Sequence, residues 1–336
     1  MHFILGPEAA AFEQEFAAAM GAKFAVGVAN GTAAIELCLR DAKVSGEVLT
    51  TAITAPFSGI GILAAGAKIR FADVDPETLS MDPDDAGNRI RRSTGALMPV
   101  HLYGQPVRID RFEKLAREKR LPLIQDACQA HGSRFDGNSL PKYSNYICYS
   151  FYPTKNLGCL GDGGAIVTNS PSINKRLRTW RDGGRKGGQV SYFPGINSRL
   201  DEMQACYLRA FLPQLDEWNA WRGRIAKLYD EALRDCPGVR PVKRHPCSVH
   251  HLYVIRADRR DRLREYLTKQ GIGTGIHYPI PMHLHPAFAM AKQKKGDLPH
   301  AEKACREILS LPLWPYLPES DAAQVAGAIR SFYLKK

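Results

Sequence analysis

One amine in a glycine-rich loop is the first candidate for chemistry. The segment SFYPTKNLGCLGDGG, residues 150–164, places Lys155 directly after NYICYSF, an apolar run that predicts a buried strand. Glycines follow the lysine at positions 158, 161, 163 and 164. A lysine amine whose surroundings lower its pKa forms Schiff bases with carbonyl compounds. Glycines would let the backbone pass close to such a ligand. The alternative is a solvated loop charge.

A second candidate is the strand-to-helix turn AVGVANGTAAIEL, residues 25–37. The first amides of a helix lack intrahelical partners, and the helix dipole adds positive potential there. Gly31 lets the backbone approach a ligand closely, and Thr32 adds a hydroxyl. Together they predict a cup for a phosphate group. Because NGT is also common in turns, an ordinary capped helix is the alternative.

A third candidate is Asp126, which ends the apolar strand in LPLIQDACQAHG, residues 121–132. A carboxylate there is costly unless it meets a cation or hydrogen-bond donors. A protonated ring nitrogen would satisfy it and would itself be stabilised as a cation. Capping of the next turn is an equal alternative. Gln129 could donate to a ring hydroxyl, whereas His131 is expected to be structural.

A phosphate cup, a carboxylate and a lysine are the three anchors that pyridoxal 5'-phosphate (PLP) needs. Ser150 could offer its hydroxyl to the phosphate. Phe57, in TAPFSG, could stack on the ring face or belong to the core. We expect no metal site, because the eight cysteines include no CxxC pair.

The elements that must position these residues alternate between helix and strand over the first two-thirds of the chain. That order predicts an α/β fold with a mostly parallel central sheet and helices on both faces. Ligands of such sheets lie beyond the carboxyl ends of the strands. The pattern changes near residue 216, so we expect a large domain over residues 1–215 and a smaller α+β domain over residues 216–336.

Composition narrows the function classes. The net charge of +12 suits a polyanionic ligand, but the basic residues are dispersed and no nucleic-acid-binding motif appears, so we expect no nucleic acid partner. No apolar run reaches the length of a membrane span, and the first residues lack the features of a signal peptide. We therefore expect a cytoplasmic protein with reduced thiols.

Several segments resemble, in order, the DegT/StrS family of PLP-dependent aminotransferases of nucleotide-linked keto sugars. They are GPEAAAFEQEFAAAMGAKFAVGVANGTAAIEL, PVHLYGQPVRIDRF, QDACQAHG, SFYPTKNLGCLGDGGAIVTN, NSRLDEMQA, HLYVIR and IHYPIPMHLHPAF. The resemblance spans nearly the whole chain. It implies the type I aminotransferase fold and a homodimer with active sites at the subunit interface.

The resemblance also implies roles for the candidate residues. The Schiff-base lysine falls on Lys155, the pyridinium partner on Asp126 and the ring-hydroxyl partner on Gln129. The ring-stacking position falls on Phe57. Four positions match the family's phosphate ligands: Thr32, the Ala33 amide, Ser150 and Asn197. The asparagine matched by Asn197 reaches the phosphate from the other subunit.

By the same resemblance, L-glutamate is the amino donor. The acceptor that HLYGQP and IHYPIP indicate is carbon three of a dTDP-linked 3-keto-6-deoxyhexose. His277 and Tyr278 are candidate sugar contacts, with packing in a turn as the alternative. Amination at carbon four, a UDP-linked sugar, a cyclitol, PLP-dependent dehydration and a non-catalytic regulator stay open. Some relatives replace the lysine with histidine and become dehydratases, so Lys155 favours amino transfer.

The chain departs from the family at its start. Members usually carry some two dozen residues before the GPE helix, and here only MHFIL precedes it. We expect either a misplaced start or an altered substrate pocket.

Overall fold

Apolar runs separated by amphipathic helices assemble into one mixed sheet. A computed structural model describes residues 3–334, so Met1 and His2 of the segment before the first helix lie outside the described residues. A three-stranded and a four-stranded sheet are joined by bridges from Leu97 to Leu123 and from Val100 to Asp126. The resulting strand order is β3 (Lys68–Ala72), β2 (Glu47–Thr51), β4 (Thr94–Met98), β5 (Ile124–Asp126), β8 (Tyr146–Ser150), β9 (Gly164–Thr168) and β1 (Phe24–Val28).

The prediction of a mostly parallel sheet is confirmed. In the described residues, β9 alone runs against its neighbours, β8 and β1, while the other pairings of this sheet are parallel. The connection between β8 and β9, residues 151–163, contains no helix. A parallel return normally needs a crossover element, so this loop brings the chain back antiparallel. Lys155 lies in that loop.

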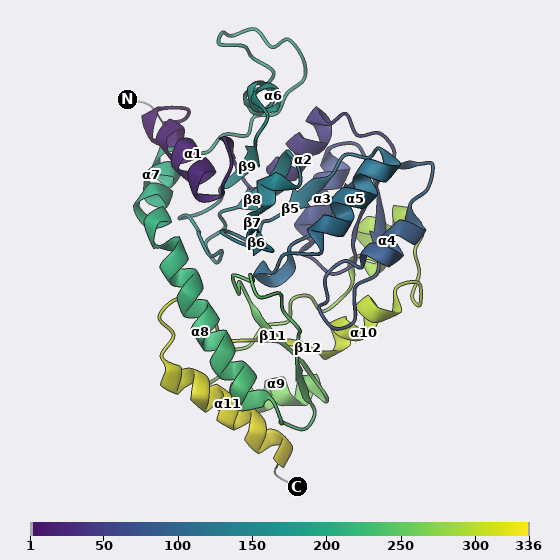
Figure 1. Cartoon of the computed structure of the whole chain (residues 1–336), viewed down its shortest axis with the longest axis vertical. Helices are drawn as coiled ribbons and strands as arrows, with labels where there is room; N and C mark the ends of the chain where they lie inside the picture. The colour runs from purple at the N-terminus through teal and green to yellow at the C-terminus, as the bar shows by residue number, and fades with distance from the viewer. Residues whose placement is uncertain (1–2, 335–336) are drawn as a thin grey trace.

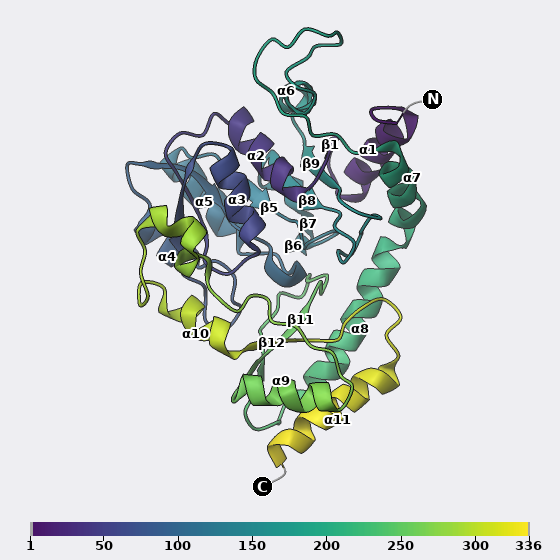
Figure 2. The same ribbon diagram turned by 180° about the vertical axis from the view of Figure 1, so that it is seen from behind.

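Helices cover both faces of the sheet, as predicted (Figures 1 and 2). Alternate strand residues point to opposite faces. On β8, Cys148 packs with one core that includes α2, α3 and α6, whereas Ile147 and Tyr149 pack with α1 and α7. A further core joins β2, β3 and β4 to α4 and α5. These helices are α1 (Pro7–Ala19), α2 (Gly31–Asp41), α3 (Pro56–Ala64), α4 (Pro83–Arg89), α5 (Ile109–Lys119), α6 (Pro171–Arg181) and α7 (Glu202–Phe211).

Beyond a long helical connection lies a separate core in the C-terminal part of the chain, named the second core. The 3-10 turn η3 (Leu212–Gln214) interrupts the helix at Pro213, which lacks the backbone donor that a continuous helix needs. Helix α8 (Leu215–Leu233) then descends from the large body to the lower part of the molecule (Figure 1). The second core packs α8, α9 (Arg260–Lys269) and α11 (Glu319–Leu334) against an antiparallel sheet of β10 (Val239–Pro241), β11 (Tyr253–Ala257) and β12 (Ile308–Leu311). The boundary at residues 215/216 stays a prediction.

Part of the C-terminal region returns to the large core. Buried residues of η4 (Met282–Leu284), η5 (Pro286–Ala291) and α10 (Pro299–Glu307) pack with α2 and β3. Small elements complete the fold: β6 (Arg134–Phe135), β7 (Asn138–Ser139), η1 (Leu102–Gly104) and η2 (Leu140–Lys142). Among residues 3–334, no helix combines the length and the apolar character that crossing a membrane requires.

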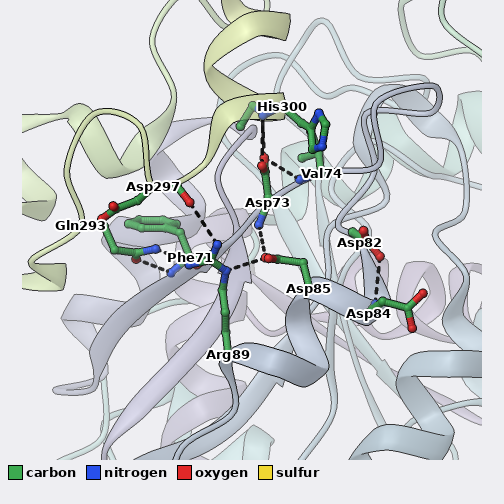
Figure 3. Close-up of polar contacts among 11 residues, drawn as sticks. Phe71, Asp73, Val74, Asp82, Asp84, Asp85, Arg89, Gln293, Asp297 and His300 are labelled. Atoms are coloured by element: carbon green, nitrogen blue, oxygen red, sulfur yellow. Dashed lines mark hydrogen bonds and ion pairs between the residues drawn. The ribbon is translucent and has the colours of Figure 1, made fainter.

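Polar contacts fasten this returning segment to the edge of the sheet (Figure 3). The Gln293 amide accepts a hydrogen bond from the Phe71 N–H and donates one to the Phe71 carbonyl, at 2.8 and 2.9 Å. Asp73, buried just after β3, accepts from the backbone amides of His300 and Ala301, at 3.0 and 2.8 Å. A carboxylate at these amides supplies acceptors that the start of α10 lacks within the helix.

We predict that Asp73→Ala lowers the free energy of unfolding by about 2 kcal/mol, because it leaves two helix amides without an acceptor. Chemical denaturation followed by circular dichroism would measure the change. Asp84→Ala is the control, since the Asp84–Arg111 ion pair is exposed and should contribute little. Equal losses in the two variants would contradict this account of Asp73.

Candidate active site

The candidate residues collect at one edge of the sheet. Strands β1, β2, β5 and β8 end there, and each is followed directly by a turn that carries candidate side chains. Because parallel strands present their carboxyl ends at the same edge, distant sequence segments meet without long loops.

The start of α2 fits the predicted phosphate cup. Asn30 is extended, and its side-chain oxygen accepts from the Ala33 N–H at 2.9 Å. The described hydrogen bonds include none from the Gly31 or Thr32 amides, so both donors are available. The Ala33 amide, predicted as a phosphate ligand, would have to share its hydrogen with Asn30. A Cβ atom on Gly31 would lie 2.8 Å from the Sγ of Cys128 and from the Cβ of Ser150. Only glycine allows these three turns to approach so closely.

The expectation that the glycines after Lys155 let the backbone pass close to a ligand stays a prediction, but two of them have a packing role. A Cβ atom on Gly164 would lie 2.5 Å from the carbonyl carbon of Asn30, and one on Gly158 would lie 2.6 Å from the Pro153 oxygen. These glycines therefore pack the lysine loop against its own chain and against the start of α2.

Asp126 is buried and already partly satisfied. Its Oδ2 accepts from the Ser58 hydroxyl at 2.6 Å, and its Oδ1 accepts from the Cys128 N–H at 3.1 Å. The second contact is the turn-capping alternative. A carboxylate accepts about four hydrogen bonds, so capacity remains for a ring nitrogen. Asp126 can therefore cap the turn and bind a ring nitrogen at the same time.

Gln129 is oriented by two tyrosines. Its Oε1 accepts from the Tyr103 N–H at 2.7 Å, and its Nε2 donates to the Tyr278 hydroxyl at 3.1 Å. The Tyr103 contact fixes which end of the amide is the donor. One Nε2 hydrogen remains for a ligand. Burial raises the pKa of Tyr278 to about 12, so its phenol stays neutral and keeps a proton to donate.

The predicted sugar contacts are held from two sides. Tyr103 donates its phenol proton to the His277 carbonyl, and the His277 Nδ1 lies 2.9 Å from the Ser310 hydroxyl of β12. Burial lowers the pKa of His277, and the charge of Lys155 lowers it further. Tyr103 thus connects the Gln129 turn to residues 277–278.

Lys155 has the environment that a nucleophilic amine requires. The structure gives its ammonium no hydrogen-bond or ion-pair partner among residues 3–334. Burial lowers the pKa of Lys155 below its ordinary value, while Cys128 and Asp126 oppose that effect. A lowered pKa increases the fraction of neutral amine near pH 7.

Two predicted residues lie apart from these contacts. Phe57, at the start of α3, is 63% exposed, so it is not the core aromatic that was the alternative. Asn197 is exposed in the segment after α6, and its backbone bridges to Asp182. No described contact brings Asn197 to the Lys155 of its own chain. In the same described residues, no cluster of histidine, cysteine, aspartate and glutamate could hold a metal ion.

Comparison with known proteins agrees with this arrangement. The sequence profile of the DegT/DnrJ/EryC1/StrS aminotransferase family matches residues 1–330. The chain belongs to this family. A dTDP-3-amino-3,4,6-trideoxy-alpha-D-glucose transaminase from Streptomyces venezuelae is 41% identical over 334 residues, covering 98% of this chain and 88% of the relative.

Solved structures of relatives share the fold of this aminotransferase. A crystal structure of S. venezuelae DesV in complex with a ketimine intermediate superposes with a TM-score of 0.97 at 40% identity, covering 100% of this chain and 91% of that one. The structure of ntda from Bacillus subtilis with bound cofactor PMP has a TM-score of 0.90 at 27% identity, covering 98% and 78%. The predicted fold and family are thereby confirmed.

The cofactor of this DegT/DnrJ/EryC1/StrS aminotransferase is PLP, as predicted. The residues present fit that group. Within residues 3–334, the amine of Lys155 has no partner and the Gly31 and Thr32 amides are free for a phosphate, while Asp126 has capacity for a ring nitrogen. Ser150 adds a half-buried hydroxyl beside Gly31.

Two residues of the site, Ser58 and Tyr103, were not predicted from the sequence. Ser58 directly follows Phe57 but had no signal of its own, because its partner Asp126 is 68 positions away. Tyr103 lies in the segment HLYGQP, which was used only for the family resemblance. Its role depends on a backbone amide and on a carbonyl 174 positions away.

We predict that Tyr103→Phe weakens sugar binding more than cofactor binding. The variant loses the phenol contact to the His277 carbonyl but keeps the backbone contact to Gln129. The KM for the sugar should rise about tenfold, as expected for loss of a buried hydrogen bond, while PLP affinity stays within about twofold. Steady-state kinetics and PLP titration would measure both.

Tyr229→Phe is the matched control for Tyr103→Phe, because it also removes a phenol donor to a buried carbonyl, that of Pro312, in the second core. A rise in KM of the same size in the control, or a parallel loss of PLP affinity in Tyr103→Phe, would refute the connecting role of Tyr103.

Proposed function

We propose that this aminotransferase moves an amino group from L-glutamate to carbon three of a dTDP-linked 3-keto-6-deoxyhexose, as a homodimer with shared active sites. The observation that carries the proposal is the partly buried amine of Lys155, which has no partner among residues 3–334, in the loop after β8, the strand that pairs with β5 where the buried Asp126 ends it. The 3-amino sugar and dTDP in the name of the S. venezuelae relative support the choice of carbon and nucleotide. The cytoplasmic location stays a prediction.

PLP, when bound, supplies an aldehyde that condenses with amines and a ring that accepts an electron pair. Lys155 would hold the aldehyde carbon, Asp126 the protonated ring nitrogen and Gln129 the ring hydroxyl. The Gly31 and Thr32 amides, with the hydroxyls of Thr32 and Ser150, would hold the phosphate.

Proton movement falls to Lys155. Its neutral Nζ would take the proton from the alpha carbon of glutamate and pass it to the cofactor. In the second half-reaction it would carry a proton from the cofactor to carbon three of the sugar. The Ser58 hydroxyl and the Cys128 amide fix the direction of the Asp126 side chain, because both donate to its oxygens. The half-buried phenol of Tyr278, still protonated, can donate to a sugar oxygen.

A second copy of the chain accounts for exposed apolar side chains near the site. Phe57 is 63% exposed, and Tyr152 and Leu160, in the lysine loop, are 53% and 69% exposed. Large apolar side chains that are this exposed are candidates for burial in a subunit interface. The segment after α6 extends away from the body (Figures 1 and 2). If that segment reaches toward a partner, Asn197 can serve the partner's site, although no described contact joins it to Lys155 of its own chain.

The first test is a visible spectrum of the purified protein with PLP, before and after L-glutamate. In the wild type, the band of the lysine-bound cofactor should fade and the pyridoxamine band should rise. Lys155→Ala should show no band of lysine-bound cofactor, and its pyridoxamine band should rise about 10²- to 10⁴-fold more slowly, the usual contribution of a general base. Lys142→Ala, which alters an exposed lysine, is the control. No spectral change in the wild type would reject glutamate as donor.

The second test concerns the shared site. Lys155→Ala and Asn197→Ala should each be impaired alone, the latter through weaker PLP binding at limiting cofactor. Mixed dimers of the two variants contain one site with both residues intact if Asn197 serves the partner's lysine. Random mixing should then restore about a quarter of the wild-type activity, since half of the dimers are mixed. No recovery would show that the two residues serve the same chain's site, or that no dimer forms.

A further inference from the structure

Asn156, the residue after Lys155, is buried and makes hydrogen bonds with every polar atom of its side chain. Its Nδ2 donates to the Asn219 Oδ1 at 2.8 Å and to the Val249 carbonyl at 2.9 Å. Its Oδ1 lies 3.0 Å from the Nδ1 of His251. Only 2% of Asn156 is exposed, so these contacts replace water completely.

The directions of these hydrogen bonds follow from chemistry. A backbone carbonyl only accepts, so the atom facing Val249 must be the amide nitrogen. The other end of Asn156 is therefore an acceptor, and His251 must carry its proton on Nδ1. Burial holds the pKa of His251 well below its ordinary value, so the ring is neutral and has a single N–H. The arrangement admits one amide orientation and one histidine tautomer.

The partners of Asn156 belong to a different part of the chain. Asn219 lies on α8, and its own Nδ2 donates to the His131 carbonyl at 3.0 Å, next to the Gln129 turn. The His251 carbonyl accepts from Arg222 of α8, and the Val249 N–H donates to the Gly104 carbonyl beside Tyr103. One side chain thus joins the lysine loop to α8 and to residues 249–251.

We propose that Asn156 is a positioning residue for Lys155, holding the lysine's backbone against α8 and residues 249–251 so that the amine stays in its partly buried place. This inference rests on the proposed role of Lys155. It gives the segment HLYVIR, residues 251–256, a part in the site, because its first residue supplies one of the three anchors.

The consequence concerns the protonation of Lys155. If the anchor is removed, the lysine can move toward solvent, and its pKa rises toward the ordinary value because burial is what lowers it. Each unit of rise lowers the neutral fraction about tenfold at pH values below the pKa, and has no effect above it. The groups that share the electrostatic environment of Lys155 are Asp126, Cys128, His131, His251 and His277.

The test is the rate at which the full-length, cofactor-free protein captures added PLP, followed by absorbance from pH 6.5 to 10. For Asn156→Ala, we expect capture about tenfold slower than wild type at pH 7 and within about twofold at pH 10. Asn219→Ala removes one anchor partner and should show the same pattern more weakly. If Asn156→Ala fails to fold, the result for Asn219→Ala tests the positioning role on its own.

Asn169→Ala is the matched control. Asn169 also joins two segments, by accepting from the Lys23 N–H and donating to the Pro141 carbonyl, but it follows β9 at the opposite edge of the sheet. Its capture rate should match wild type at every pH, although its melting temperature should fall.

A defect in both anchor variants that is constant across pH, or wild-type rates in both, would overturn the positioning role. The role of Lys155 itself is tested separately, because Lys155→Ala should form no lysine-bound cofactor band. Persistence of that band would refute the proposed function, whatever the anchor variants show.

Discussion

The site depends on keeping an amine and a carboxylate largely out of water at the same edge of the sheet. Burial lowers the pKa of Lys155, and the nearby Asp126 limits that effect. A buried carboxylate without donors would be unfavourable, and Ser58 and Cys128 supply them. The ends of β5 and β8 bring the two groups together, and the glycines at 31 and 164 let the turns around them approach closely. The donors to Asp126 and the two glycines would be unnecessary if the amine or the carboxylate lay in solvent.

The large body around the mixed sheet and the second core meet through the site. Tyr103 joins the turn after β4 to residues 277–278, and Asn156 joins the lysine loop to α8. Farther from the chemistry, Asp73 and Gln293 hold residues 293–301 on the edge of the large sheet. A division into two domains describes the hydrophobic cores, but the polar contacts that define the site cross between them. Movement of the second core relative to the first would therefore change the surroundings of both the sugar and the lysine.

Much of this architecture could be predicted from local patterns. Alternating apolar strands and amphipathic helices were sufficient to predict the parallel sheet. Lys155 and Asp126 could be singled out because a charge next to a buried strand is costly unless a partner stabilises it. The antiparallel β9 was missed because strand patterns carry no direction, although the absence of a helix in residues 151–163 was a usable signal. Ser58, Tyr103 and Asn156 could not be found in this way. Their importance lies in partners far away in the sequence, and the side chains themselves are ordinary in their local context.

The contact between Gln293 and β3 has a consequence for behaviour in concentrated solution. β3 is an outer strand of the sheet, and an outer strand exposes backbone donors and acceptors to which another chain can add. The Gln293 amide binds both the N–H and the carbonyl of Phe71, as a residue of a neighbouring strand would. A side chain thus occupies the position where intermolecular β-pairing would begin. The same residue that fastens the C-terminal segment therefore also blocks edge-to-edge pairing at this point of β3.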